Sequence, residues 1–142
     1  MATARRRVAD PYIVFVSYSH KDRWIAKQCV RLIEEAGQGK VRTFLDAKDI
    51  DAGERIEDKV LDAIRKCDEL VVLLSANSIN RPWVLFEIGV ARGRKKPVIA
   101  ILNNLSPREM PEMIGPYKGI DLNDFDGQYL EQMQRRSEKK RR

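Results

Sequence analysis

The stretch Glu69 to Leu74, with the sequence ELVVLL, decides the fold, because every residue after the first is apolar. A strand without a polar side has no face for water, which is typical of a parallel sheet covered on both faces. Further apolar runs predict strands at Tyr12 to Tyr18 (YIVFVSY), Val41 to Leu45 (VRTFL), Pro97 to Leu102 (PVIAIL) and, more briefly, Ile120 to Leu122.

Helical patterns fill the segments between these strands. Apolar residues at helical spacing predict one helix from Arg23 to about Gly37 and a second around Ile56 to Ile64. Pro82 suits the first turn of a third helix, and a last helix is expected from about Asp126 into the basic C-terminal residues. Because strands and helices alternate, the sequence predicts an α/β fold, a flavodoxin-like doubly wound sheet of about five parallel strands with helices on both faces.

The net charge of +6 in 142 residues is concentrated at the two ends of the chain. Arg5 to Arg7 contribute three positive charges and residues 135–142 a net five, so the segment between them carries a net charge of −2. We expect one domain at 11–134, between a flexible basic N-terminus at 1–10 and a basic tail at 135–142. Such a tail can attract nucleic acid or anionic lipid, but basic ends are more often solvated, and nucleic acid is not an expected partner.

Several classes of protein are disfavoured by what the sequence lacks. No apolar run approaches the roughly 18 residues of a membrane span, and no secretory signal follows the N-terminal arginines, so we expect a cytoplasmic protein. His20 is the only histidine, which argues against a zinc site and a Ser-His-Asp triad. Neither nucleotide fingerprint, GxGxxG or GxxxxGKS/T, is present. We expect no cofactor or metal, and we expect Cys29 and Cys67 to be buried free thiols.

The most informative polar residue is Glu87, which lies within the apolar sequence WVLFEIGVA at 83–91. In a helix, Trp83 and Glu87 are one turn apart and share a face. Burying an unpaired carboxylate is costly. Either a functional site needs the glutamate there, or Glu87 lies on a solvated stripe and pairs with Arg81 or Arg92.

The predicted topology places three segments at one rim of the sheet. Residues 17–20, 46–53 and 75–87 each follow a predicted strand, and ligands of open parallel sheets bind beyond the carboxyl ends of the strands. Trp83 and Glu87 belong to the third segment. A carboxylate beside an aromatic plate suits cleavage of a glycosidic bond through an oxocarbenium-like state. No second acid is needed when the leaving group is already cationic, as nicotinamide is in NAD+.

Four segments carry motifs whose order and spacing together are specific. They are VFVSYSHKD at 14–22, KDIDAGERI at 48–56, CDELVVLLSANSINRPWVLFEIGVA at 67–91 and KKPVIAIL at 95–102. In this order the motifs resemble those of a TIR (Toll/interleukin receptor) domain, of the bacterial NAD+-cleaving type. The resemblance implies the same flavodoxin-like fold. The family divides into scaffolding domains and enzymes that are NAD+ glycohydrolases or cyclases.

The resemblance also implies a role for particular residues in cleaving the nicotinamide–ribose bond of NAD+. Glu87 corresponds to the catalytic glutamate of the W-x-x-x-E motif, and Trp83 to the tryptophan beside the nicotinamide. The implied substrate contacts are Tyr18, Ser19, His20 and Asp51. NAD+ is then a substrate rather than a cofactor, and hydrolysis and cyclisation both stay open.

The alternative within the same family is a non-catalytic scaffold. A scaffold would associate with another TIR domain, or with a copy of itself, through the loop Asp46 to Gly53. Trp83 and Glu87 favour the enzyme, because a scaffold needs neither. By family analogy the enzyme would act in bacterial immune or stress signalling, or in virulence. Its activity is expected to require self-association, because the rim of a single domain is open to water and a neighbour's loop could complete it.

Overall fold

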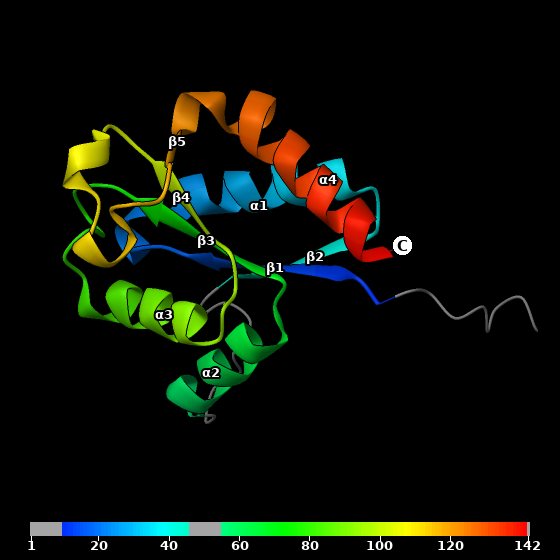
Figure 1. Ribbon diagram of the computed structural model, residues 1–142, viewed down its shortest axis with the longest axis horizontal. Coiled ribbons are helices and arrows are strands. Elements are labelled where there is room, and N and C mark those ends of the chain that lie inside the picture. Colours follow the sequence, from blue (N-terminus) through cyan, green and yellow to red (C-terminus); the bar gives the residue numbers. More distant parts are fainter. Residues whose placement is uncertain (1–9, 46–54, 142) are drawn as a thin grey trace, which may run out of the picture.

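The computed structural model describes residues 10–45 and 55–141, and a five-stranded parallel sheet lies at the centre of this part of the chain (Figure 1). The strands are β1 (Tyr12–Ser17), β2 (Val41–Leu45), β3 (Glu69–Leu74), β4 (Val98–Leu102) and β5 (Ile120–Asp121). Their order across the sheet is β2-β1-β3-β4-β5, and every neighbouring pair is parallel. The predicted flavodoxin-like sheet is confirmed.

Helices cover both faces of the sheet (Figure 1). One face carries α1 (Arg23–Gly37) and α4 (Leu130–Arg141), and the other carries α2 (Ile56–Lys66) and α3 (Pro82–Gly93). The side chains of β3 alternate between the two layers. Val71 and Leu73 pack with residues of α1 and α4, whereas Leu70, Val72 and Leu74 pack with residues of α2 and α3. All of β3 is buried, as the sequence ELVVLL predicts.

The carboxyl-terminal half of α4 is bound to the amino end of β3. The guanidinium of Arg136 donates from Nε and Nη2 to the fully buried carboxylate of Glu69, at 2.7 and 3.1 Å. The hydroxyls of Tyr12 and Tyr129 donate to the same carboxylate, each at 2.5 Å. One turn after Arg136, a similar contact joins Lys140 Nζ to Asp68 at 2.9 Å.

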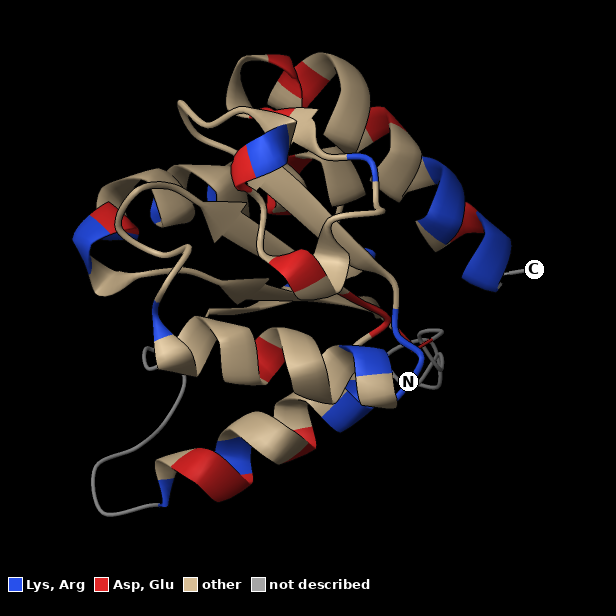
Figure 2. Cartoon of the chain, turned by 60° about the vertical axis from the view of Figure 1, so that its left-hand side comes forward, with Lys and Arg blue, Asp and Glu red and all other residues tan. Residues whose placement is uncertain are grey.

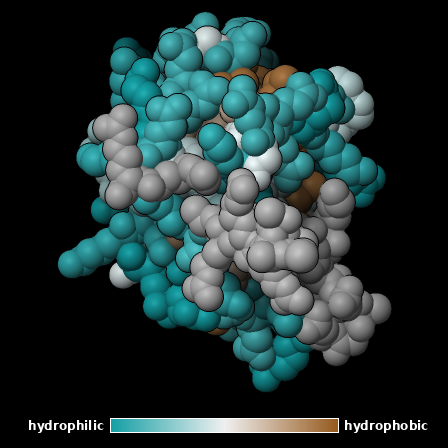
Figure 3. Space-filling view, turned by 90° about the vertical axis from the view of Figure 1, so that its right-hand side faces the viewer, coloured by the Kyte–Doolittle hydropathy of each residue, from teal (hydrophilic) through white to brown (hydrophobic). Residues whose placement is uncertain are grey.

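These contacts give two basic residues at the C-terminal end partners that the sequence does not predict. The last helix is expected to run into the basic tail, and α4 does continue through Arg141, where Arg136 and Lys140 are held by acidic residues of the domain. Lys and Arg gather at this end of α4 (Figure 2). The same end of the molecule faces the viewer in Figure 3, where the surface of the described residues is mostly hydrophilic.

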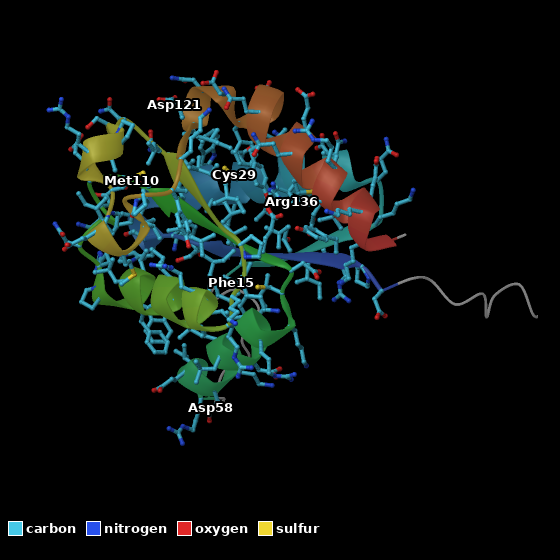
Figure 4. All side chains as sticks on the ribbon, viewed as in Figure 1. Phe15, Cys29, Asp58, Met110, Asp121 and Arg136 are labelled. Atoms are coloured by element: carbon cyan, nitrogen blue, oxygen red, sulfur yellow. The ribbon has the colours of Figure 1, made fainter. Side chains whose placement is uncertain are left out.

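Phe15 and Cys29 mark the two core layers (Figure 4). Phe15 of β1 packs with α2 and α3, and its ring stacks on that of Phe44 with the centroids 5.1 Å apart. Cys29 of α1 lies in the opposite core. Cys29 and Cys67 are both buried and free, as predicted. Burial raises the pKa of the Cys29 thiol to about 12 and that of the Cys67 thiol to about 11.

Short turns lead from β4 to the end of the chain. The segment 103–116, which follows β4, contains 3-10 turns at Pro107–Glu109 and Glu112–Ile114. The last helix, expected from about Asp126, begins with a π-helical turn at Phe125–Tyr129 and continues as α4. That turn places Tyr129 in the core, where its hydroxyl reaches Glu69.

Candidate active site

The order of the strands reverses at β1, which lies between β2 and β3. Ligands of open parallel sheets bind beyond the carboxyl ends of the strands at such a point. A cavity of about 500 Å³ lies there. The described residues that line it follow β1 (Tyr18, Ser19, His20), begin α3 (Arg81, Trp83, Val84) or begin α2 (Ile56, Glu57).

Trp83 supplies the aromatic wall of the cavity. Pro82 is the first residue of α3, where a missing N–H has no cost and the fixed φ suits the helix. Trp83 follows it with 37% of its surface exposed, and its ring stacks on that of Phe86 with the centroids 5.2 Å apart. Phe86 therefore supports the ring of Trp83 on one side, and part of the tryptophan surface remains available to a ligand.

Glu87 lies one turn further along α3 and is fully buried. The Oγ of Ser17, the last residue of β1, donates to Glu87 Oε1 at 2.6 Å. The solvated-stripe interpretation of Glu87 is therefore wrong: Arg81 donates instead to the carbonyl of Asn77, and Arg92 to that of Met113. Glu87 does not itself line the cavity that Trp83 borders.

A buried aspartate joins the two sides of the rim. Asp22, at the end of the 3-10 turn His20–Asp22, accepts from Ser75 Oγ at 2.5 Å and from Asn77 Nδ2 at 2.8 Å. Ser75 and Asn77 follow β3, so this carboxylate ties the segment after β1 to the segment that leads into α3. The sequence alone identifies Asp22 only as the residue before a helix. The neighbouring positions of β1 and β3 are the signal that brings these polar residues together.

The structure brings four of the six predicted site residues together at the cavity: Tyr18, Ser19, His20 and Trp83. Ser19 is buried, and its Oγ accepts from the backbone N–H of Lys21 at 3.3 Å, so it also shapes the turn that presents His20. His20 is exposed. Asp51, together with the loop Asp46 to Gly53, lies outside the described residues.

Four residues that line the cavity were not identified as site residues from the sequence: Ile56, Glu57, Arg81 and Val84. In the sequence, Arg81 stands out only as a candidate ion-pair partner of Glu87. Its place immediately before Pro82 and Trp83 on the rim is the signal that could have identified it. Glu57 lies in the first turn of α2, where a carboxylate interacts favourably with the helix dipole.

Metal ligation and membrane insertion find no support in the part of the chain that the structure describes. Within residues 10–45 and 55–141, no group of three or more His, Cys, Asp and Glu side chains is arranged to hold a metal ion. None of the described helices is long and apolar enough to cross a bilayer.

Comparison with protein families and curated proteins identifies relatives of this chain. The model of the TIR domain family matches residues 14–135. The chain is 27% identical over 101 residues to the "Probable 2' cyclic ADP-D-ribose synthase BdTIR" of Brachypodium distachyon. The match covers 70% of this chain and 44% of that protein, so the chain spans less than half the length of this relative.

Solved structures share the fold at low sequence identity. The TIR domain of the Toll-related receptor TRR-2 from Hydra magnipapillata is 21% identical with a TM-score of 0.72, over 88% of this chain and 97% of that one. The TIR domains of the activated Roq1 resistosome, which recognises the pathogen effector XopQ, are 18% identical with a TM-score of 0.68. That match covers 86% of this chain and 96% of the other.

Proposed function

The chain belongs to the TIR domain family, and we propose that it is an enzyme that cleaves the bond between nicotinamide and ribose in NAD+. The observation that carries the proposal is the arrangement of Trp83 and Glu87 on α3. An aromatic side chain borders the cavity at the strand-order reversal, and a buried carboxylate lies one helical turn behind it. The relative from Brachypodium, named for cyclic ADP-ribose synthesis, supports an activity of this class.

In the proposed reaction, the nicotinamide ring stacks on Trp83, and Tyr18, Ser19 and His20 contact the rest of the substrate. The bond between ribose C1′ and the ring nitrogen breaks, and its electron pair neutralises the positive charge of the nicotinamide. Positive charge then develops on the ribose, and the Glu87 carboxylate stabilises it. Water attacks C1′ and loses a proton to give ADP-ribose. A hydroxyl or an adenine nitrogen of the same molecule gives a cyclic product instead.

The burial of Glu87 sets a condition on this mechanism. Its carboxylate is fully buried and does not line the cavity, so the ribose can reach it only if side chains at the cavity floor move. Ser17 holds one carboxylate oxygen and so fixes the orientation of the group before substrate arrives. An oriented carboxylate stabilises developing charge better than one that must reorganise during the reaction.

The proposal also includes a role for the loop Asp46 to Gly53 and a biological role for the enzyme, both by analogy with the family. Asp51 contacts the substrate, and the loop Asp46 to Gly53 binds a second copy of the chain or another TIR domain, which completes the open rim. NAD+ is the substrate, and no resident cofactor takes part. We place the enzyme in the cytoplasm, acting in bacterial immune or stress signalling or in virulence, on family analogy.

Nicotinamide release from NAD+ at high protein concentration tests the proposal. We compare the native chain with Glu87→Gln, which keeps an acceptor for Ser17 Oγ and removes the charge. The matched control is Glu131→Gln, an exposed residue of α4. We expect Glu87→Gln to lower the rate by about 10²-fold or more, and the control to leave it unchanged.

Circular dichroism and thermal melting of each variant separate a catalytic loss from a loss of fold. Equal release by the native chain and a folded Glu87→Gln variant removes Glu87 from the mechanism. No release by the native chain, even when it is concentrated or crowded into assemblies, favours the scaffold, which works through contacts between TIR domains.

A further inference from the structure

Arg81 is the residue at the candidate site whose chemistry the proposed mechanism does not yet use. It is half-buried and lines the cavity two residues before Trp83. Among the described residues of the lining, it is the one Lys or Arg. The acidic side chain in the same lining, Glu57, belongs to α2, and no ion pair joins it to Arg81. The cation therefore stays available to an anionic ligand.

The Nε atom of Arg81 is held by a segment that also joins the two sides of the rim. Arg81 Nε donates to the carbonyl oxygen of Asn77 at 3.3 Å. Asn77 is itself held by Asp22, to which its side-chain amide donates at 2.8 Å, and by Ser75 Oγ, which accepts from its backbone N–H at 3.0 Å. In the described part of the molecule, neither terminal nitrogen of Arg81 has a hydrogen-bond acceptor.

We infer that Arg81 binds the phosphate groups of the substrate, an inference that rests on the proposed cleavage of NAD+ at this site. A guanidinium presents its N–H groups in a planar fork that matches two phosphate oxygens, and it stays charged at every physiological pH. With Nε bound to Asn77, the terminal nitrogens form this fork at the cavity. The nicotinamide end of the dinucleotide lies on Trp83, and its diphosphate lies on Arg81.

This assignment predicts selectivity for the phosphate-bearing part of the ligand. Arg81 should contribute to the binding of NAD+ and of ADP-ribose, which carry a diphosphate, and not to that of nicotinamide riboside, which carries none. A single charged hydrogen-bonding group of this kind, partly open to water, is expected to change affinity about tenfold. Its contribution should fall as salt is added, because the site is not fully buried.

The experiment measures both turnover and binding. A failure of this inference can then be distinguished from a failure of the proposed function. ADP-ribose binding to the full chain is measured by calorimetry for the native chain, for Arg81→Gln and for Arg94→Gln. Arg94 is an exposed arginine at the other end of α3 and serves as the matched control. The KM for NAD+ and the rate with nicotinamide riboside are measured in parallel.

We expect Arg81→Gln to raise the Kd for ADP-ribose and the KM for NAD+ about tenfold and to leave turnover of nicotinamide riboside unchanged. Unchanged ADP-ribose binding, or an equal loss with all three ligands, overturns the inference. If the native chain binds ADP-ribose through Arg81 but releases no nicotinamide, the proposed function falls and the inference stands. Arg81→Met, which keeps the aliphatic stem, replaces Arg81→Gln should that variant not fold, and must show the same losses.

Discussion

Replacing Arg136 by methionine should show how strongly the fold depends on the neutralisation of one buried carboxylate. Glu69 is fully buried at the amino end of β3 and accepts two hydrogen bonds from Arg136 and one from each of two tyrosines. Arg136→Met keeps most of the aliphatic packing and leaves the carboxylate with two neutral donors. Removing one member of a buried ion pair costs about 3–5 kcal/mol, because the remaining charge stays out of water.

The exposure of Arg136 places the expected loss at the lower end of that range. Its side chain is 30% exposed, so water already screens part of the interaction, and Tyr12 and Tyr129 still donate to Glu69 in the variant. We expect a loss of about 3 kcal/mol in the free energy of unfolding. For a chain of this size that loss corresponds to a fall of about 10 °C in Tm.

Urea unfolding and thermal melting measure this loss, with Arg135→Met as the control on the exposed side of the same helix. The double variant Glu69→Gln/Arg136→Met should be less destabilised than the sum of the two single variants, because a neutral amide needs no cation. An Arg136→Met variant within about 1 kcal/mol of the native chain, or a double variant that equals the sum, would refute the reasoning.

Two further predictions concern side chains whose pKa is shifted by burial. Burial and the charge of Glu69 raise the pKa of Tyr12 and of Tyr129 above the ordinary 10.0. The unfolded chain loses these protons first, so their stabilisation is complete below about pH 10 and is lost above it. The urea midpoint should fall above that pH, and a midpoint that stays constant there would contradict this. Cys29 and Cys67, whose pKa values are raised, should react slowly with iodoacetamide until urea unfolds the chain, whereas rapid labelling of the native protein would show an accessible thiol.

The sequence predicts the strands well because burial on both faces leaves a local pattern. ELVVLL has no polar alternation, and β3 is the central strand with helices on both sides. The same pattern identifies Glu87 as an unusual residue in an apolar helix but leaves burial and a solvated stripe both open, and only the structure shows that Glu87 is buried. Local sequence also places Trp83 at the rim, because Pro82 marks the start of α3 and Trp83 follows it in the first turn.

Local sequence patterns do not predict the hydrogen-bond partners of the buried acids Glu69 and Asp22. Glu69 is bound by residues that are 57, 60 and 67 positions away in the chain, and no local pattern connects them. Asp22 meets Ser75 across 53 positions for the same reason. Such contacts depend on which strands are neighbours and on the exact register of the sheet, and both are set by the packing of the whole domain. The contacts that hold Arg136 and Lys140 against the domain could not be predicted for the same reason.

The anchoring of α4 decides how the basic C-terminal residues can be studied. A chain truncated after residue 134 would lose Arg136 together with the surface cations, so weaker binding to a polyanion would not distinguish a destabilised domain from a missing contact. Arg135 and Lys139 are exposed on the same helix, and neither side chain forms an ion pair with another described residue. Charge-neutralising substitutions at these two positions remove surface charge while leaving the anchor intact. Unlike the truncation, these substitutions test directly whether this end of the protein attracts anionic surfaces.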